Sequence, residues 1–239
     1  MTYEAVLSVV PDLHASPPIL PHTDDPTIVP VPPPPDGYDF IFHVGVAGRG
    51  NLRLERLGHK LNYRMTDAEG QYAPAVQPPK ESADSEAERL ENERILLSLL
   101  GRSLTPAIYG DMGVTNPNQP VEVQPARGFG ENYETFADEL YTDVDVPRLI
   151  RHLKAVGIEY IYPSMDAGHY LCDFIYYCSL AEAKRGSEQT DGSDDEALPA
   201  APTTPILSMH CPPVDQPLST QAMSDAIYRI TEWVCANYV

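Results

Sequence analysis

Basic residues are scarce in this chain. Its 239 residues include 16 lysines and arginines against 35 aspartates and glutamates, and the formal net charge is -19 at pH 7 with histidine neutral. Nucleic acids and anionic membrane surfaces bind proteins through clusters of basic side chains. The charge balance therefore argues against either of them as the main partner.

Cysteines and long apolar runs are also few. The 4 cysteines, at positions 172, 178, 211 and 235, have neither the spacing of a disulfide framework nor a Cys-x-x-Cys metal pattern. No apolar run approaches the ~20 residues that a membrane helix needs. Residues 1–10 lack the basic flank and cleavage-site pattern of a signal peptide. We therefore expect reduced thiols and a cytoplasmic location.

The apolar residues that are present alternate between strand-like and helix-like patterns. Strands are expected at 38–46, 51–57, 158–162 and 206–210, and helices at 3–13, 82–100, 143–156, 172–185 and 219–238. This alternation predicts an α/β fold, a three-layer α/β/α sandwich with a mostly parallel central sheet. The continuous apolar run at 38–46 predicts a strand that is buried on both faces.

A single domain covering residues 1–239 is expected, because the apolar segments are too dispersed for two cores. Proline is abundant, with 25 residues, and a Pro-rich stretch at 15–37 predicts an exposed, extended connector. Residues 101–133 are rich in Gly, Pro and Asn, and residues 186–205 are acidic and poor in bulky apolar side chains. Both stretches are predicted to be disordered loops.

Cys172 stands at a position that suits a nucleophile. It follows an expected strand and a turn of small residues, and it opens an apolar helix. The N-terminus of a helix carries partial positive charge and free N–H groups, which favour a thiolate. The alternative is a small buried hydrophobe, because free cysteine is among the most buried residue types.

Glu55 and His210 also fall beside expected strand ends, where α/β sheets gather their reactive groups. A thiol nucleophile needs an imidazole to take its proton, and that imidazole needs a partner that fixes its tautomer. Taken singly, Glu55 is expected to be a solvated charge and His210 a strand cap. Their spacing in the sequence leaves open whether they meet Cys172.

Three glycines, Gly45, Gly48 and Gly50, follow the first expected strand. Their spacing is not G-x-G-x-x-G, and no Lys-Ser pair follows them. We interpret them as a tight strand-exit loop in preference to a phosphate cradle.

Three segments together resemble the pyroglutamyl-peptidase I family, which are pyrrolidone carboxyl peptidases and cysteine exopeptidases. Phe42–Gly50 with Leu54–Tyr63 is similar to the family's glutamate motif. Asp166–Asp173 is similar to its nucleophile motif, and Ser208–Pro213 to its histidine motif. The resemblance is strongest to the fungal-type branch.

The resemblance implies a Cys-His-Glu triad. Cys172 attacks the carbonyl of an N-terminal pyroglutamyl residue, and His210 accepts the thiol proton and later protonates the leaving amine. Glu55 orients the histidine, and water releases pyroglutamate. The implied substrates are peptides with an N-terminal pyroglutamate, and no metal or organic cofactor is needed. Cys178 and Cys211 are interpreted as structural.

The sequence departs from the family at its start. No segment of this sequence matches the family's first strand or its Gly-Phe-x-Pro-Phe loop. In the family that loop grips the lactam ring. A second hypothesis is therefore a catalytically impaired or inactive fragment, or a pseudoenzyme. A third is a general binding module with incidental cysteine and histidine, which the set of three motifs disfavours.

Overall fold

The computed structural model describes residues 1–22, 25, 27, 31–76, 126–189 and 203–239. The chain divides into two units, Met1–Ala75 with Arg127–Val239, and Val76–Ala126. The first unit is described below. The predicted helix at 82–100, and the parts of the predicted loops at 101–125 and 190–202, lie outside the described residues.

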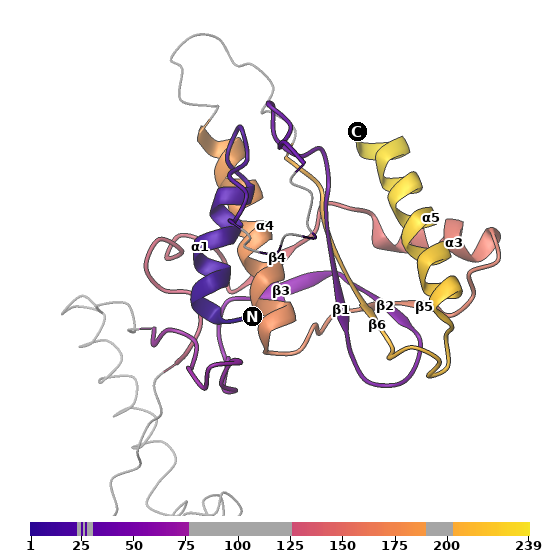
Figure 1. Ribbon diagram of the computed structural model, residues 1–239, viewed down its shortest axis with the longest axis horizontal. Coiled ribbons are helices and arrows are strands. Elements are labelled where there is room, and N and C mark those ends of the chain that lie inside the picture. The colour runs from indigo at the N-terminus through magenta and orange to yellow at the C-terminus, as the bar shows by residue number, and fades with distance from the viewer. Residues whose placement is uncertain (23–24, 26, 28–30, 77–125, 190–202) are drawn as a thin grey trace, which may run out of the picture. The chain divides into compact units, whose positions relative to one another are not determined.

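The described residues of the first unit form six strands and four helices (Figure 1). In chain order these are α1 (Tyr3–Leu13), β1 (Ile41–Val46), β2 (Leu52–Glu55), β3 (Leu57–His59), β4 (Glu139–Tyr141), α3 (Val146–Ala155), β5 (Ile161–Ser164), α4 (Leu171–Gln189), β6 (Ile206–Cys211) and α5 (Thr220–Tyr238).

The central sheet has the strand order β1-β6-β2-β5. Strand β1 pairs with β6 in parallel and β2 pairs with β5 in parallel, whereas β2 and β6 are antiparallel. Strands β3 and β4 form a separate antiparallel pair. The sheet is thus mixed but mostly parallel, as the sequence predicted.

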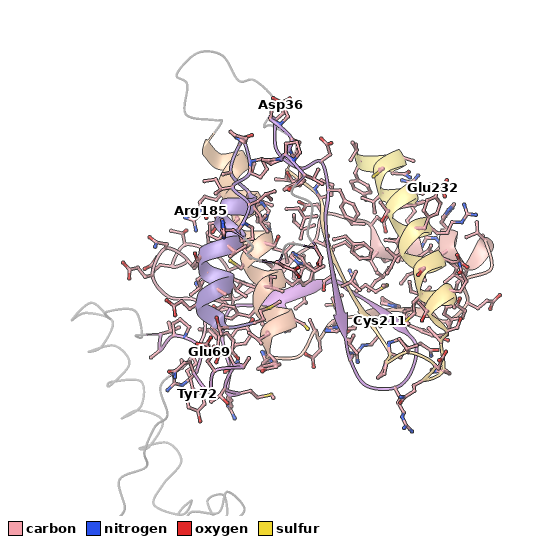
Figure 2. All side chains as sticks on the ribbon, viewed as in Figure 1. Asp36, Glu69, Tyr72, Arg185, Cys211 and Glu232 are labelled. Carbon is pink, nitrogen blue, oxygen red and sulfur yellow. The ribbon has the colours of Figure 1, made fainter. Side chains whose placement is uncertain are left out.

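Helices cover both faces of this sheet. Helices α3 and α5 pack on one face, where their apolar side chains meet Leu52, Leu54 and Met209. Helix α4 contacts the sheet through β6 and β1, and α1 packs against α4. Figure 1 shows the strands lying between the α1–α4 pair and the α3–α5 pair, and Figure 2 shows side chains filling the spaces between them. The α/β/α sandwich is confirmed.

The described helices begin at or near the predicted residues, except that α3 begins at Val146 and not at residue 143. Thr2, Asp145 and Ser219 are N-caps of α1, α3 and α5, and the side chain of each accepts a backbone N–H from the first turn. Pro147 occupies the first turn of α3, where its missing N–H costs no hydrogen bond. None of the helices in the described ranges is long and apolar enough to cross a membrane.

Strand β1 corrects one prediction. Among the described residues it pairs with β6 only, at an edge of the sheet, and none of its six residues is fully buried. Its side chains Val44 and Val46 are 47% and 67% exposed. A continuous apolar run is typical of a central parallel strand, but the strand order is set by long-range pairing that the run does not encode.

The other expected strands lie close to their predicted positions, with one shift. Strand β5 begins at Ile161 and not at residue 158, and it includes Pro163. Proline lacks a backbone N–H, and β5 tolerates it because β5 is the other edge strand.

The described ends of the two predicted loops pack against or belong to the regular structure. Phe129 and Tyr133, within the predicted loop at 101–133, are 1% and 5% exposed. The ring of Phe129 stacks on Phe174 of α4, with 4.0 Å between centroids. Helix α4 also continues past residue 185 to Gln189. The signal that was overlooked is the pair of aromatic residues, Phe129 and Tyr133, within a Gly- and Pro-rich stretch, because buried aromatic rings fix a loop to the core.

Candidate active site

Three chain segments bring the candidate catalytic residues to the α4 face of the sheet. In β2, Leu52 and Leu54 belong to the core under α3 and α5, so alternation places Glu55 on the opposite face. Strand β6 is the antiparallel neighbour of β2, with Glu55 opposite Ser208. The same alternation places His210 on the face that carries Glu55. Cys172 lies in the first turn of α4, which covers that face.

Glu55 and His210 form a buried pair. Nδ1 of His210 lies 2.7 Å from Oε1 of Glu55, and the two residues are 4% and 0% exposed. The interpretation of Glu55 as a solvated surface charge is therefore wrong. The other carboxylate oxygen, Oε2, has no hydrogen-bond partner among the described residues, and Nε of Arg53 is 3.7 Å from Oε1. A buried carboxylate needs a compensating charge, and His210 is the nearer of the two basic groups that face it, with Arg53 the other.

Gly45 of β1 lies next to both the thiol of Cys172 and the imidazole of His210. A Cβ at this position would lie 2.9 Å from Sγ of Cys172 and 3.4 Å from Nε2 of His210. The thiol and Nε2 therefore face the same small volume, which a side chain at Gly45 would invade. Gly45 lies within both the predicted strand at 38–46 and the observed β1, at the register of His210.

His210 lies beside the sulfur of Cys172 and is hydrogen-bonded to Glu55. Interaction with Cys172, followed by the hydrogen bond with Glu55, raises its pKa from 6.5 to about 9 against the opposing effect of burial. These two neighbours therefore favour the protonated ring. An imidazolium next to a cysteine is the arrangement that activates thiolate nucleophiles.

The remaining cysteines have other surroundings. Cys178 is fully buried with its sulfur 3.2 Å from the hydroxyl of Tyr133, and burial raises its pKa to about 12. The thiol of Cys211 donates to the carbonyl oxygen of Gly45 at 3.3 Å, and burial raises its pKa also. Figure 2 labels Cys211 at the end of β6. These two positions agree with the structural roles expected for both cysteines.

Comparison with known proteins finds likeness in structure alone. No protein-family model matches the sequence, and no curated protein matches it. Among solved structures, the A199P mutant of pyrrolidone carboxyl peptidase from P. furiosus has a TM-score of 0.46 and 16% sequence identity, covering 84% of this chain and 71% of that one. The pyrrolidone carboxyl peptidase of Fervidobacterium islandicum AW-1 has a TM-score of 0.45 and 18% identity, with coverage of 84% and 70%. The chain is thus distantly similar in structure to pyrrolidone carboxyl peptidases.

Proposed function

We propose that this chain is a cysteine omega-peptidase that removes an N-terminal pyroglutamyl residue from peptides. The observation that carries the proposal is the position of His210, which is hydrogen-bonded to Glu55 and whose Nε2 atom faces the same small volume at Gly45 as the sulfur of Cys172. The chemistry of these three residues is that of acyl transfer by a thiol. The motifs at 42–63, 166–173 and 208–213 supply the substrate class, because they resemble the pyroglutamyl-peptidase I family.

The proposed reaction uses His210 as both base and acid. The sulfur of Cys172 attacks the pyroglutamyl carbonyl carbon, and the thiol proton resides on His210. The C–N bond then breaks, and the imidazolium gives this proton to the leaving amine. Water next attacks the thioester and gives its proton to His210, and the C–S bond breaks to release pyroglutamate. The expelled thiolate of Cys172 remains beside the imidazolium, which restores the starting pair. Throughout, Glu55 holds the ring by its Nδ1 atom.

A second candidate is a member of the same class that holds the three residues but turns over substrate poorly. Two cavities among the described residues have volumes of about 270 Å³ and 550 Å³, and neither is lined by Cys172, His210 or Glu55. A lactam ring needs an enclosing pocket beside the nucleophile. This candidate therefore differs from the first in substrate binding rather than in the chemical groups.

The test compares two fluorogenic substrates, pyroglutamyl-aminomethylcoumarin and prolyl-aminomethylcoumarin, which differ by the lactam carbonyl. The ring nitrogen is therefore a neutral amide in the first and a basic amine in the second. We expect the purified full chain to hydrolyse the first and not the second. Activity should vanish in Cys172→Ala and persist in Cys235→Ala, which removes an exposed thiol on another helix. A folded parent chain without turnover supports the impaired candidate. Activity that survives in Cys172→Ala contradicts both.

A further inference from the structure

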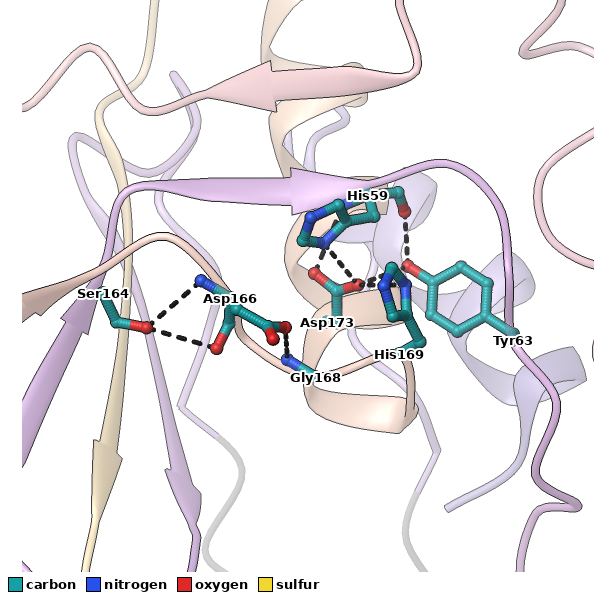
Figure 3. Close-up of polar contacts among 7 residues, drawn as sticks. All are labelled: His59, Tyr63, Ser164, Asp166, Gly168, His169 and Asp173. Atoms are coloured by element: carbon teal, nitrogen blue, oxygen red, sulfur yellow. Dashed lines mark hydrogen bonds and ion pairs between the residues drawn. The ribbon is translucent and has the colours of Figure 1, made fainter. Parts of the chain in front are cut away.

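A second group of side chains with ligand atoms lies around the turn that precedes α4 (Figure 3). His59 ends β3, whereas Asp166 and His169 belong to the turn between β5 and α4. Each of the three offers one possible ligand atom, and these atoms all lie within 4.8 Å of one another. None of these residues has a role in the proposed peptidase reaction.

A buried carboxylate supports His59 from behind. Asp173 is fully buried, and its Oδ2 atom lies 3.1 Å from Nδ1 of His59. The backbone N–H of His59 and the hydroxyl of Tyr63 also donate to this carboxylate, at 3.2 Å and 3.1 Å. Histidines that bind metals usually have such a carboxylate on their other ring nitrogen. When Nδ1–H donates to Asp173, Nε2 keeps the lone pair that a metal ion requires.

His169 contributes a ring nitrogen, Nδ1, that is buried and makes no hydrogen bond to any described residue. This atom lies 3.8 Å from Oδ2 of Asp173, and the ring centroid is 4.5 Å from that of His59. Burying a polar atom without a hydrogen bond costs free energy of folding, and a bound ligand would remove that cost.

The turn itself holds Asp166 in place. Oδ1 of Asp166 accepts the N–H of Gly168 at 2.8 Å, and Oγ of Ser164 accepts the N–H of Asp166 at 3.2 Å. Gly168 has φ of +76°, a left-handed conformation that favours glycine. It lies in the turn between Asp166 and His169. These contacts appear as dashed lines in Figure 3. They occupy one carboxylate oxygen and leave the other for a ligand.

We propose that His59, His169 and Asp166 bind one divalent transition-metal ion of the zinc class. Two imidazoles and a carboxylate favour such an ion over calcium or magnesium, which prefer oxygen ligands. Zinc holds such ligands at about 2.0–2.2 Å, so the three atoms need to approach one another slightly. The partial exposure of Asp166 and His169 allows that movement. The ion joins the end of β3 to the turn that leads into α4, with the fourth position open to water.

The test is calorimetric titration of the full chain with Zn²⁺ at pH 7.5. We expect one bound ion, with affinity reduced at least ~100-fold in His169→Ala and about 10- to 100-fold in Asp173→Asn, which alters the group behind His59. The matched control is His152→Ala, an exposed histidine on α3 that should leave the affinity unchanged. Equal affinity in the parent chain and in His169→Ala overturns the proposal.

Thiols also bind zinc, so a second titration is needed to distinguish binding by cysteines from binding by the histidine site. The titration is repeated in the double variant Cys172→Ser and Cys235→Ser, which removes the exposed and the half-buried thiol. Binding that is retained there, and is lost on adding His169→Ala, supports the histidine site. Binding that disappears with the two cysteines alone contradicts it. The readout is metal affinity, so the result does not depend on the proposed peptidase activity.

Discussion

The titration of His210 is the feature of the candidate site with the clearest physical consequence. Interactions with Cys172 and with Glu55 raise its pKa from 6.5 to about 9. A rise of this size corresponds to roughly 3 kcal/mol in favour of the imidazolium. Replacing Glu55 by Gln keeps the size of the side chain and removes its charge. We therefore expect the pKa of His210 to fall by at least about one unit in Glu55→Gln.

The same shift predicts how stability depends on pH. In the unfolded chain His210 titrates near its ordinary value of about 6.5, so the folded state holds the proton more tightly. The stabilisation from this group is fully present below pH ~6.5 and is lost as pH rises through about 9. The free-energy difference between the parent chain and Glu55→Gln should therefore be larger at pH 6 than above pH 9.

The assay is an NMR titration of the imidazole resonances, with His210 assigned by comparison with His210→Ala. Urea unfolding of the parent chain and of Glu55→Gln, at pH 6 and above pH 9, provides the matching stability data. A parent titration near the ordinary value refutes the reasoning. So does a high pKa that Glu55→Gln leaves unchanged, because the carboxylate would then contribute nothing to it.

Four further predictions follow from the packing. Gly45→Ala places a methyl group 2.9 Å from the thiol of the candidate nucleophile and should lower peptidase turnover about 10- to 100-fold, whereas Gly48→Ala, with no atom within 4 Å, should not. Gly58→Ala places its methyl 2.9 Å from the backbone of α4 and should cost about 1–3 kcal/mol in urea unfolding. Gly186→Ala lies in open space on a helix and should stabilise by about 0.5–1 kcal/mol. Burial lowers the pKa of His43 to about 4, so stability should fall as pH drops from 6.5 towards 4, and the fall should be shallower in His43→Phe.

The helices were predictable from the sequence because local chemistry determines where they begin. Ser219 and Asp145 are capping residues, and the apolar periodicity that follows each of them gives the buried face. The edge position of β1 was not predictable, because pairing partners are far apart in the chain. Strands β3 and β4 were missed for the same reason, since each has only three residues and forms by pairing with the other.

The chemical identity of the candidate site was predictable, but its environment was not. Motif resemblance pointed to Cys172, His210 and Glu55, whereas the full burial of Glu55 depends on the packing of α4 over the sheet. The place of Gly45 beneath the thiol arises from the parallel pairing of β1 with β6. The cluster around Asp173 was missed because His59 meets it across a long stretch of sequence.

The most direct test of the central account is the catalytic coupling of the sulfur at residue 172 to the imidazole at residue 210. Hydrolysis of the pyroglutamyl substrate is measured in Cys172→Ala, in His210→Ala and in the double variant. Residues that act as one unit show losses that do not add. The account predicts that each single variant loses as much activity as the double variant. Substantial turnover in either single variant, or losses that multiply in the double variant, would contradict it.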